Sequence, residues 1–302
     1  MSTDALPALP CYLNGEYTLL RNARISVMDR GFIFGDGVYE VVPVYGSCLF
    51  RFEQHMARLE RSLAELRIPN PHARAQWREI AQRLVTSYAK DSGAPDPEKL
   101  DQMVYLQVTR GVALREHAML DGLTPTVFVM TNAMKQPTDA LRAQGASCVT
   151  AEDFRWEKAH IKSTSLLGSV MARQISVDAG VDETILFRDV WLSEASASNV
   201  WIVKDGVLLG PPRDNLVLEG IRYVLFEEIC QTHDIPMELR RVNRDEVLAA
   251  DEVLLSSATK EVLPVTRIDG QPVGDGRPGP VYAQLYAGYQ AAKLQARLRR
   301  HT

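Results

Sequence analysis

The sequence has few of the features that mark secreted or metal-binding proteins. It has only four cysteines in 302 residues, and they are scattered, with no Cys-x-x-Cys pair and no cluster with the six histidines. This spacing argues against a disulfide framework and gives no metal-ligand pattern. We therefore expect reduced thiols, a reducing compartment and no bound metal.

Long apolar runs and an excess of positive charge are also missing. No apolar stretch is long enough to cross a bilayer, and the first residues have neither the basic region nor the apolar core of a signal peptide. Lys and Arg number 34 against 38 Asp and Glu, so no overall positive field attracts nucleic acid or acidic membranes. The densest basic run, residues 296–301, ends a helix-like stretch, where cations are favoured. We expect a cytoplasmic protein that binds neither nucleic acid nor membrane.

What is present suits a packed protein of enzyme size. Hydrophobic residues make up 46% and charged residues 24%, as in ordinary soluble proteins, and the length favours two domains. The polar segment Lys135-Gln136-Pro137-Thr138 lies in the best candidate for a linker. We therefore predict a smaller domain over 1–134, a linker over 135–144 and a larger domain over 145–302.

The local patterns predict a mixed α+β protein. Asn14-Gly15 and Gly46-Ser47 each separate two strand-like runs, which indicates two hairpins. Apolar residues at helical spacing predict amphipathic helices over 53–67 and 77–89. The remaining predicted strands are 104–109, 126–130, 146–150, 184–187, 200–203, 207–209 and 252–255, and the remaining predicted helices are 165–179, 222–233 and 243–250.

Two short segments contain residue types suited to cofactor chemistry. Lys162 lies where an apolar-flanked segment gives way to a Ser/Thr-rich helix start, so it can point into the protein; the alternative is a solvated surface lysine. Glu194 precedes a run of small polar residues, for which the alternative is a serine-rich turn. A carboxylate beside a pyridine ring can keep the ring nitrogen protonated and make the ring an electron sink.

Several motifs together, in this order, resemble the class IV aminotransferases over residues 12–264. The motifs are Asp29-Arg30-Gly31, Gly35-Asp36-Gly37-Val38-Tyr39-Glu40, Glu53-Gln54-His55-Met56-Ala57-Arg58-Leu59, Lys162-Ser163, Glu194-Ala195-Ser196-Ala197-Ser198-Asn199, Gly220-Ile221-Arg222 and Ser257-Ala258-Thr259-Lys260-Glu261. The resemblance implies a two-domain fold of type IV, with an α/β N-terminal domain and a pseudo-barrel C-terminal domain. It also implies pyridoxal 5'-phosphate as the cofactor.

The same resemblance implies roles for individual residues. Lys162 is similar to the lysine that holds the cofactor as a Schiff base and then moves the proton, a role that suits an amine. Glu194 is similar to the partner of the pyridine nitrogen. Arg58 is similar to the phosphate-binding arginine, whose planar fork matches phosphate oxygens; by itself it could be a solvated helix residue.

Further cofactor contacts are implied in the second half of the chain. Ile221 and Arg222 resemble a helix start whose backbone amides bind the phosphate, and Ser257 and Ala258 resemble a second phosphate loop. Ser196 belongs to the implied cofactor contacts as well. The chain departs from the family where Arg222 and Ala258 replace frequent threonines. Ala195 replaces a frequent glycine, which requires a negative φ at that position.

The run from Val108 to His117 resembles D-amino acid aminotransferases. Arg115 and His117, with Tyr39, resemble the residues that bind the substrate α-carboxylate; a strand-like segment would put the first two on one face, and the alternative is an exposed polar loop. The implied reaction is D-alanine plus 2-oxoglutarate giving pyruvate plus D-glutamate, with other D-amino acids and 2-oxo acids accepted. In such relatives the Arg-x-His loop serves the neighbouring subunit of a homodimer.

Three other activities of the same fold stay open at this point. They are branched-chain L-amino acid aminotransferase, (R)-amine transaminase and aminodeoxychorismate lyase. A protein of another class, a small-molecule binding module that kept the fold without its chemistry, is disfavoured by the joint presence of Lys162, Glu194 and Arg58.

Overall fold

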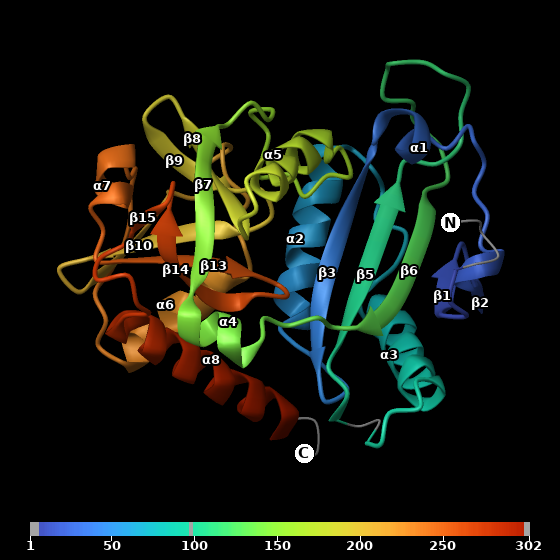
Figure 1. Ribbon diagram of the computed structural model, residues 1–302. Coiled ribbons are helices and arrows are strands. Elements are labelled where there is room, and N and C mark those ends of the chain that lie inside the picture. The colour runs from blue at the N-terminus through green and yellow to red at the C-terminus, as the bar shows by residue number, and fades with distance from the viewer. Residues whose placement is uncertain (1–5, 97–98, 299–302) are drawn as a thin grey trace. The chain divides into compact units, whose positions relative to one another are not determined.

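The computed structural model describes residues 6–96 and 99–298 (Figure 1). The first five residues, which belong to the region inspected for a signal peptide, and residues 299–301 of the basic run lie outside the described residues. Among the helices that are described, none is both long and apolar enough to span a membrane.

The chain forms two compact units. The first comprises Met1–Met134, Ile161–Leu166 and Ala296–Thr302, and the second comprises Lys135–His160 and Leu167–Gln295. Residues 161–166 differ from the predicted division, in which 145–302 formed one domain. They join the first unit because their backbone bonds to the edge of its sheet: Tyr39 N–H donates to the Lys162 carbonyl at 3.0 Å, and Thr164 N–H to the Gly37 carbonyl at 2.9 Å.

The first unit is built on an antiparallel six-stranded sheet in the order β2-β1-β6-β5-β3-β4. Its strands are β1 (Pro10–Leu13), β2 (Glu16–Leu19), β3 (Gly37–Tyr45), β4 (Cys48–Leu49), β5 (Gln102–Thr109) and β6 (Thr126–Ala133). Both predicted hairpins are confirmed, since β1 pairs with β2 and β3 pairs with β4. Asn14 and Ser47 adopt the positive φ that their tight turns need.

The helices of this unit are α1 (Arg30–Phe34), α2 (Phe52–Glu65) and α3 (Arg74–Asp91), with a 3₁₀ turn at Leu20–Asn22. The predicted helices over 53–67 and 77–89 correspond to α2 and α3, whereas the short α1 was not predicted. Along β3 the even-numbered residues, such as Val38 and Val42, are buried in a core with Met56 and Leu59 of α2. Tyr39 therefore projects from the opposite face of the sheet.

The second unit contains a nine-stranded mixed sheet in the order β12-β11-β10-β13-β14-β7-β8-β9, with β15 beside β14. Its strands are β7 (Ala146–Glu152), β8 (Glu183–Arg188), β9 (Trp191–Ala195), β10 (Asn199–Lys204), β11 (Val207–Gly210), β12 (Met237–Leu239), β13 (Glu252–Ser257), β14 (Glu261–Ile268) and β15 (Gln271–Pro272). Its helices are α4 (Asp139–Gln144), α5 (Leu167–Asp178), α6 (Arg222–Thr232), α7 (Arg244–Leu248) and α8 (Pro280–Leu298). The predicted α+β class is confirmed.

Several sequence-based expectations about this unit are incomplete, and the strands β12, β14 and β15 were not predicted. The predicted linker 135–144 is half helical, because Thr138 caps the start of α4 by accepting a hydrogen bond from Leu141 N–H. The strand β9, which ends next to the Ser196-Ala197-Ser198 turn, was not predicted. Its charged Glu194 obscured the strand pattern, although that side chain is buried.

Candidate active site

Lys162 lies in the first unit, beside the edge of β3. Its N–H donates to the Ser62 hydroxyl of α2 at 3.3 Å, and the preceding Ile161 is buried in the core. The Lys162 side chain takes the other direction, with Nζ 4.2 Å from the centre of the Tyr39 ring. The lysine is thus partly buried against an aromatic face and is not a fully solvated surface residue.

Tyr39 belongs to an aromatic surface on the sheet face opposite α2. Its ring stacks on Tyr105 at a centroid distance of 5.7 Å, and the Tyr105 hydroxyl donates to Gln107 at 2.7 Å. Burial, with the nearby Tyr39, raises the pKa of Tyr105 to about 12, so this phenol keeps its proton at neutral pH. Tyr105 supports Tyr39 and adds no charge next to Lys162.

Arg58 of α2 is buried in a three-residue ionic cluster. Its Nε and Nη2 donate to the two oxygens of Glu40 at 2.7 and 2.8 Å, and the His55 ring nitrogen Nδ1 lies 2.7 Å from the same carboxylate. Burial alone would raise the pKa of Glu40, but Arg58 more than offsets it and holds that pKa well below its usual range. The alternative of a solvated helix arginine is wrong.

Arg115 and His117 do not lie on a strand. Residues 114–122 have no helix or strand structure and both side chains are exposed, so the strand-like expectation is wrong and the polar-loop alternative describes the backbone. The loop nevertheless brings the two side chains to one aromatic ring. The Arg115 guanidinium carbon and the His117 ring lie 5.4 and 5.3 Å from the centre of the Phe34 ring.

In the second unit, Glu194 is a buried carboxylate at the end of β9. One oxygen accepts a hydrogen bond from Arg155 Nη1 at 2.6 Å, and the other accepts the Leu218 N–H at 3.1 Å and the Asn199 amide at 3.4 Å. Burial raises the pKa of Glu194, and Arg155 opposes this shift without cancelling it. The side chain thus lies in a buried frame rather than on an exposed serine-rich turn.

Arg155 is a residue that the sequence interpretation missed. Its Nε and Nη2 donate to Asp153 at 2.9 and 2.8 Å, while Nη1 reaches Glu194. Arg155 holds the pKa of Asp153 down to about 2 although burial would raise it, so Asp153 stays ionised and keeps the guanidinium in place. The Asp-x-Arg spacing after β7 is a weak signal for this pair, and nothing local pointed to Glu194.

Ser196 and the following turn rest on a second buried acid. The Ser196 hydroxyl donates to Glu183, whose other oxygen accepts from Lys260 Nζ at 2.9 Å. Because its one hydrogen is used in this way, the Ser196 hydroxyl can act toward a cofactor only as an acceptor. Ala195 is not among the residues with positive φ, so the condition for replacing a glycine there is met.

The two predicted phosphate segments are connected by Arg222. Helix α6 starts at this residue without a side-chain cap, and Arg222 Nη2 donates to the Tyr289 hydroxyl at 2.7 Å and to the Ala258 carbonyl at 3.3 Å. The nearby Ser257 hydroxyl accepts the Lys260 N–H at 3.1 Å. The arginine that replaces a threonine thus holds the start of α6 next to the Ser257–Ala258 turn.

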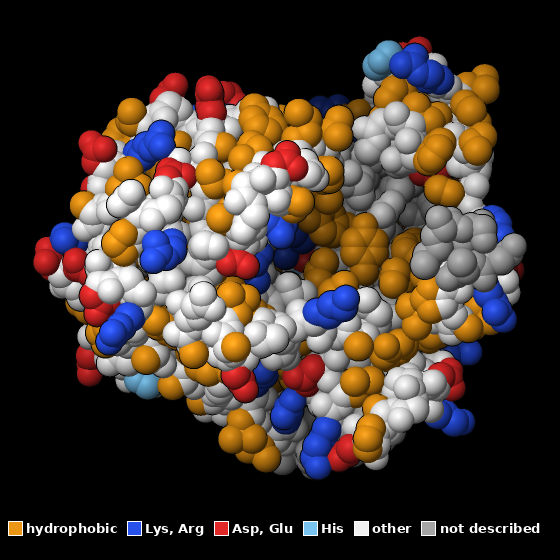
Figure 2. Space-filling model, in the orientation of Figure 1, with side chains coloured by type: hydrophobic (Ala, Val, Ile, Leu, Met, Phe, Trp, Pro, Cys, Tyr) orange, Lys and Arg blue, Asp and Glu red, His pale blue; other side chains and the backbone are white. Residues whose placement is uncertain are grey.

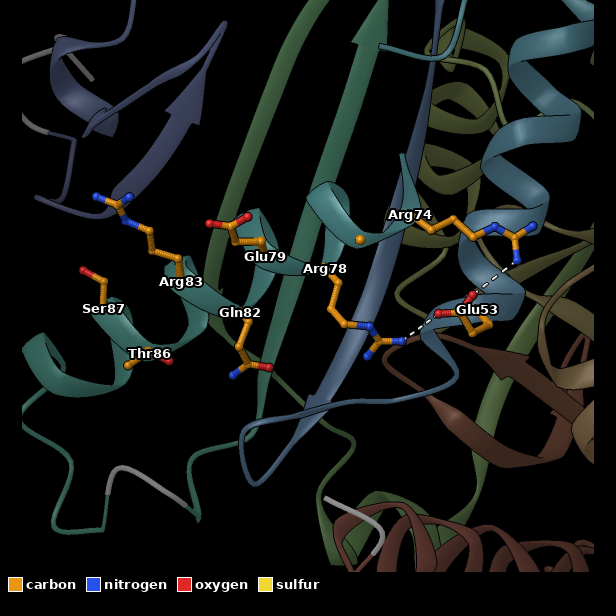
Figure 3. Close-up of a pocket in the computed structure, with 9 residues that line it drawn as sticks. Glu53, Arg74, Arg78, Glu79, Gln82, Arg83, Thr86 and Ser87 are labelled. Atoms are coloured by element: carbon orange, nitrogen blue, oxygen red, sulfur yellow. Dashed lines mark hydrogen bonds and ion pairs between the residues drawn. The ribbon is translucent and has the colours of Figure 1, made fainter. Parts of the chain in front are cut away.

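The first unit has a wide hollow whose lining includes none of these residues (Figure 3). It is lined by α3 and by Glu53 of α2, and two of its arginines form surface ion pairs: Arg74 with Glu53 at 3.2 Å and Arg78 with Glu53 at 2.7 Å. Such exposed ion pairs contribute little to the stability of the fold. None of the predicted site residues borders the hollow, and we assign it no chemistry.

Comparison with known proteins identifies the family. The model of the family "Amino-transferase class IV" matches residues 37–268. The chain belongs to the class IV aminotransferases and is an aminotransferase.

Its relatives extend over almost the whole chain. D-alanine aminotransferase of Bacillus licheniformis is 38% identical over 281 residues, covering 93% of this chain and 96% of the relative. D-alanine aminotransferase of Staphylococcus aureus (strain COL) is 36% identical, covering 92% and 96%.

Solved structures with the same fold include transaminases of other kinds. The fold IV-transaminase from Curtobacterium pusillum has a TM-score of 0.77 at 25% identity, with 91% of this chain and 93% of that chain covered. The branched-chain aminotransferase from Thermoproteus uzoniensis with norvaline has a TM-score of 0.83 at 23% identity, with 96% of each chain covered. The two-domain fold of type IV that was predicted is confirmed.

The donor set of each unit fits a phosphorylated pyridine aldehyde. The first unit offers a primary amine at Lys162, on the aromatic face of Tyr39. The second offers a buried carboxylate at Glu194 and an uncapped helix start at α6, whose backbone N–H groups suit an anion. Arg222 Nε is buried without a hydrogen-bond partner among the described residues, an orphaned donor at the start of this helix.

Proposed function

We propose that this aminotransferase uses pyridoxal 5'-phosphate to exchange amino groups between D-amino acids and 2-oxo acids. The proposed reaction is D-alanine plus 2-oxoglutarate giving pyruvate plus D-glutamate, with other D-amino acids accepted. The main support is the likeness to D-alanine aminotransferases over more than nine tenths of the chain. The gathering of Arg115 and His117 at Phe34 is consistent with carboxylate binding by these two residues.

Each residue has a separate task in this proposal. When bound, the cofactor supplies an electron sink for the bond that breaks at the substrate α-carbon. Lys162 would hold the cofactor through its amine, and its Nζ would take up the α-carbon proton. Glu194 keeps a proton on the pyridine nitrogen, and Arg155 favours the ionised carboxylate that this requires.

The remaining residues bind and orient. Arg58 and the backbone N–H groups at Ile221 and Arg222 bind the phosphate, and Ser196 accepts a hydrogen bond as a further cofactor contact. Ser257 and Ala258 form the second phosphate segment. Tyr39, Arg115 and His117 bind the substrate α-carboxylate. The amine is transferred in two half-reactions, so the kinetics should be ping-pong.

A panel of D- and L-amino acids with 2-oxoglutarate, with the products resolved by chirality, tests this function. We expect turnover of D-alanine and formation of D-glutamate. Turnover of L-leucine without D-alanine would replace the proposal by branched-chain L-amino acid aminotransferase, and turnover of (R)-amines alone by (R)-amine transaminase. Formation of pyruvate from aminodeoxychorismate would identify a lyase.

Substrate binding by Arg115 can be tested by replacing it. Hydrogen bonds to a charged partner contribute roughly 1.5–3 kcal/mol, so Arg115→Ala should lower kcat/KM for D-alanine by about tenfold to a few hundredfold. Arg115→Lys should recover only part of this, because lysine lacks the bidentate fork. Cofactor absorbance should persist in both variants. Unchanged D-alanine turnover in Arg115→Ala would place the carboxylate elsewhere.

We also propose that the active form is a homodimer in which the Arg115-x-His117 loop serves the neighbouring subunit. This loop and the segment before α1 expose large apolar side chains to solvent: Val27 is 70% exposed, Leu114 85% and Met119 49%. Exposed apolar side chains that lie together often mark a protein interface. Figure 2 shows hydrophobic side chains gathered at its upper right, over the part of the chain that carries α1.

Sedimentation should therefore find twice the mass of one chain at assay concentration. Val27→Asp, which puts a charge on this apolar surface, should shift the protein toward the monomer and lower its activity with dilution. A wild-type monomer that is fully active would contradict the dimer.

We further propose that the enzyme works in the cytoplasm. All four cysteines lie within the described residues and none is in a disulfide. Three of them are buried, and burial raises the pKa of Cys148 and Cys230, which disfavours their reactive thiolate forms. The protein therefore suits a reducing compartment.

A further inference from the structure

The loop that carries Arg115 and His117 is tied down at its base by main-chain bonds. Arg30 N–H donates to the Gly111 carbonyl at 2.9 Å, and Ala113 N–H to the Met28 carbonyl at 3.3 Å. Gly111 has a φ of 102°, and a Cβ atom there would lie 2.0 Å from the Thr124 carbonyl oxygen. This position at the start of the loop therefore requires glycine. Among the described residues, side-chain bonds support the loop at residues 116–118.

The Arg30 side chain holds the middle of this loop, between Arg115 and His117. Its Nη1 donates to the carbonyl of Glu116, the residue between Arg115 and His117. The Glu116 carboxylate in turn accepts the N–H groups of His117 and Ala118 at 2.7 and 3.2 Å, which closes a tight turn. Arg30 thus binds the main-chain carbonyl of the residue that lies between Arg115 and His117.

The Arg30 side chain is itself anchored to the folded frame of the first unit. It is 3% exposed, and its Nε donates to Asp36 at 2.7 Å. Asp36 also accepts from Arg110 Nε at 2.7 Å, and Arg110 Nη2 donates to the Leu66 carbonyl at 2.6 Å. Burial would raise the pKa of Asp36, but the two arginines lower it below its ordinary value, so the anchor is ionised at neutral pH.

Phe34, the last residue of α1, provides the second support. Its ring is contacted by three basic side chains: the Arg30 guanidinium carbon lies 4.9 Å from the ring centre, that of Arg115 5.4 Å, and the His117 ring 5.3 Å. The negative face of an aromatic ring attracts such groups. The ring therefore gives Arg115 and His117 a shared platform although no strand aligns them.

We propose that Arg30 and Phe34 are positioning residues that pre-arrange Arg115 and His117 for the substrate carboxylate. Pre-organised contacts bind more tightly because less side-chain freedom is lost on binding. The inference rests on the proposed function, in which Arg115 and His117 are the carboxylate contacts. The new part of the proposal is that two residues of α1 hold the Arg115 and His117 side chains in position.

The test compares carboxylate binding in the holoenzyme of Arg115→Ala and of five further variants. The probe is propionate, an unreactive carboxylate, measured as a competitive inhibitor against D-alanine. Phe34→Leu removes the aromatic face with little loss of volume, and Phe34→Tyr retains it. Arg30→Gln removes the link to Asp36. Arg24→Gln is the control, since Arg24 is exposed and its side chain donates to the backbone carbonyls of Arg21 and Ala23.

We expect Phe34→Leu and Arg30→Gln to raise the inhibition constant of propionate and the KM for D-alanine about three- to tenfold, with a smaller change in kcat. Phe34→Tyr and Arg24→Gln should match the wild type. In the fifth variant, Phe34→Leu combined with Arg115→Ala, the Phe34 replacement should add little, because positioning effects vanish once the positioned group is gone. Borohydride labelling of Lys162 should persist throughout, which shows that each variant folds and binds cofactor.

The outcomes separate the two proposals. If Arg115→Ala weakens propionate but Phe34→Leu and Arg30→Gln do not, the positioning role is wrong and the carboxylate contact stands. If Arg115→Ala itself has no effect on propionate, the proposed substrate contact is wrong and the positioning role falls with it. Equal, additive effects in the double variant would also contradict positioning, since they would show that Phe34 acts independently of Arg115.

Discussion

Replacement of Lys162 by alanine should abolish transamination, with kcat reduced by at least about a thousandfold. Proton transfer by a positioned base typically accelerates a reaction by roughly 10²–10⁴-fold, and in the proposed role Lys162→Ala also removes the covalent attachment of the cofactor. Its partly buried amine on the Tyr39 ring is suited to both roles. Steady-state rates with D-alanine and 2-oxoglutarate measure the loss.

The same assignment can be tested chemically on the wild-type protein. Borohydride reduction followed by peptide mapping should place the pyridoxyl group on Lys162. Lys158→Ala is the matched control, because Lys158 is an exposed lysine four positions earlier and should leave the rate unchanged. A label on Lys158 or Lys204, or substantial turnover by Lys162→Ala, would contradict the assignment.

The second large effect is expected at Glu194. Glu194→Gln keeps the shape of the side chain but removes the charge to which we assign the pyridine nitrogen, so kcat should fall by about 10²–10³-fold, as for other pre-organised electrostatic contacts. The cofactor should still be held through Lys162 and the phosphate contacts, and its absorbance should persist. Glu152→Gln, at an exposed carboxylate in the same unit, should have no such effect. An undiminished kcat in Glu194→Gln would remove this residue from the proposed chemistry.

The pH dependence of kcat reports on the same carboxylate. Burial raises the pKa of Glu194 and Arg155 opposes the shift, so activity should fall on the acid side as Glu194 takes up a proton. Removal of the positive neighbour disfavours the ionised form, so Arg155→Gln should move this acid limb to higher pH. Arg155→Lys keeps the charge and should stay nearer the wild-type profile. If Arg155→Gln left the limb in place, Arg155 would not control Glu194.

Much of the fold could be predicted because its signals are local. The Asn14-Gly15 and Gly46-Ser47 turns, and the apolar stripe along α2, are properties of a few consecutive residues, and the structure confirms them. Where local signals conflict with burial, prediction failed. The strand β9 contains a charged residue that only the buried contacts of Glu194 make acceptable.

The sequence by itself determined the family and most of the elements, since each depends on residue types at fixed spacing, and it led to the prediction of Lys162 as the cofactor lysine. Only the tertiary structure decided which distant residues meet. Arg155 and Glu194 pair although 39 residues separate them, and Arg30 reaches the Glu116 carbonyl across 86 residues. Sequence patterns do not indicate such pairs, because the pairs depend on how strands and loops pack and on the burial that this packing creates. The same packing placed Arg115 and His117 beside Phe34, where a strand had been expected.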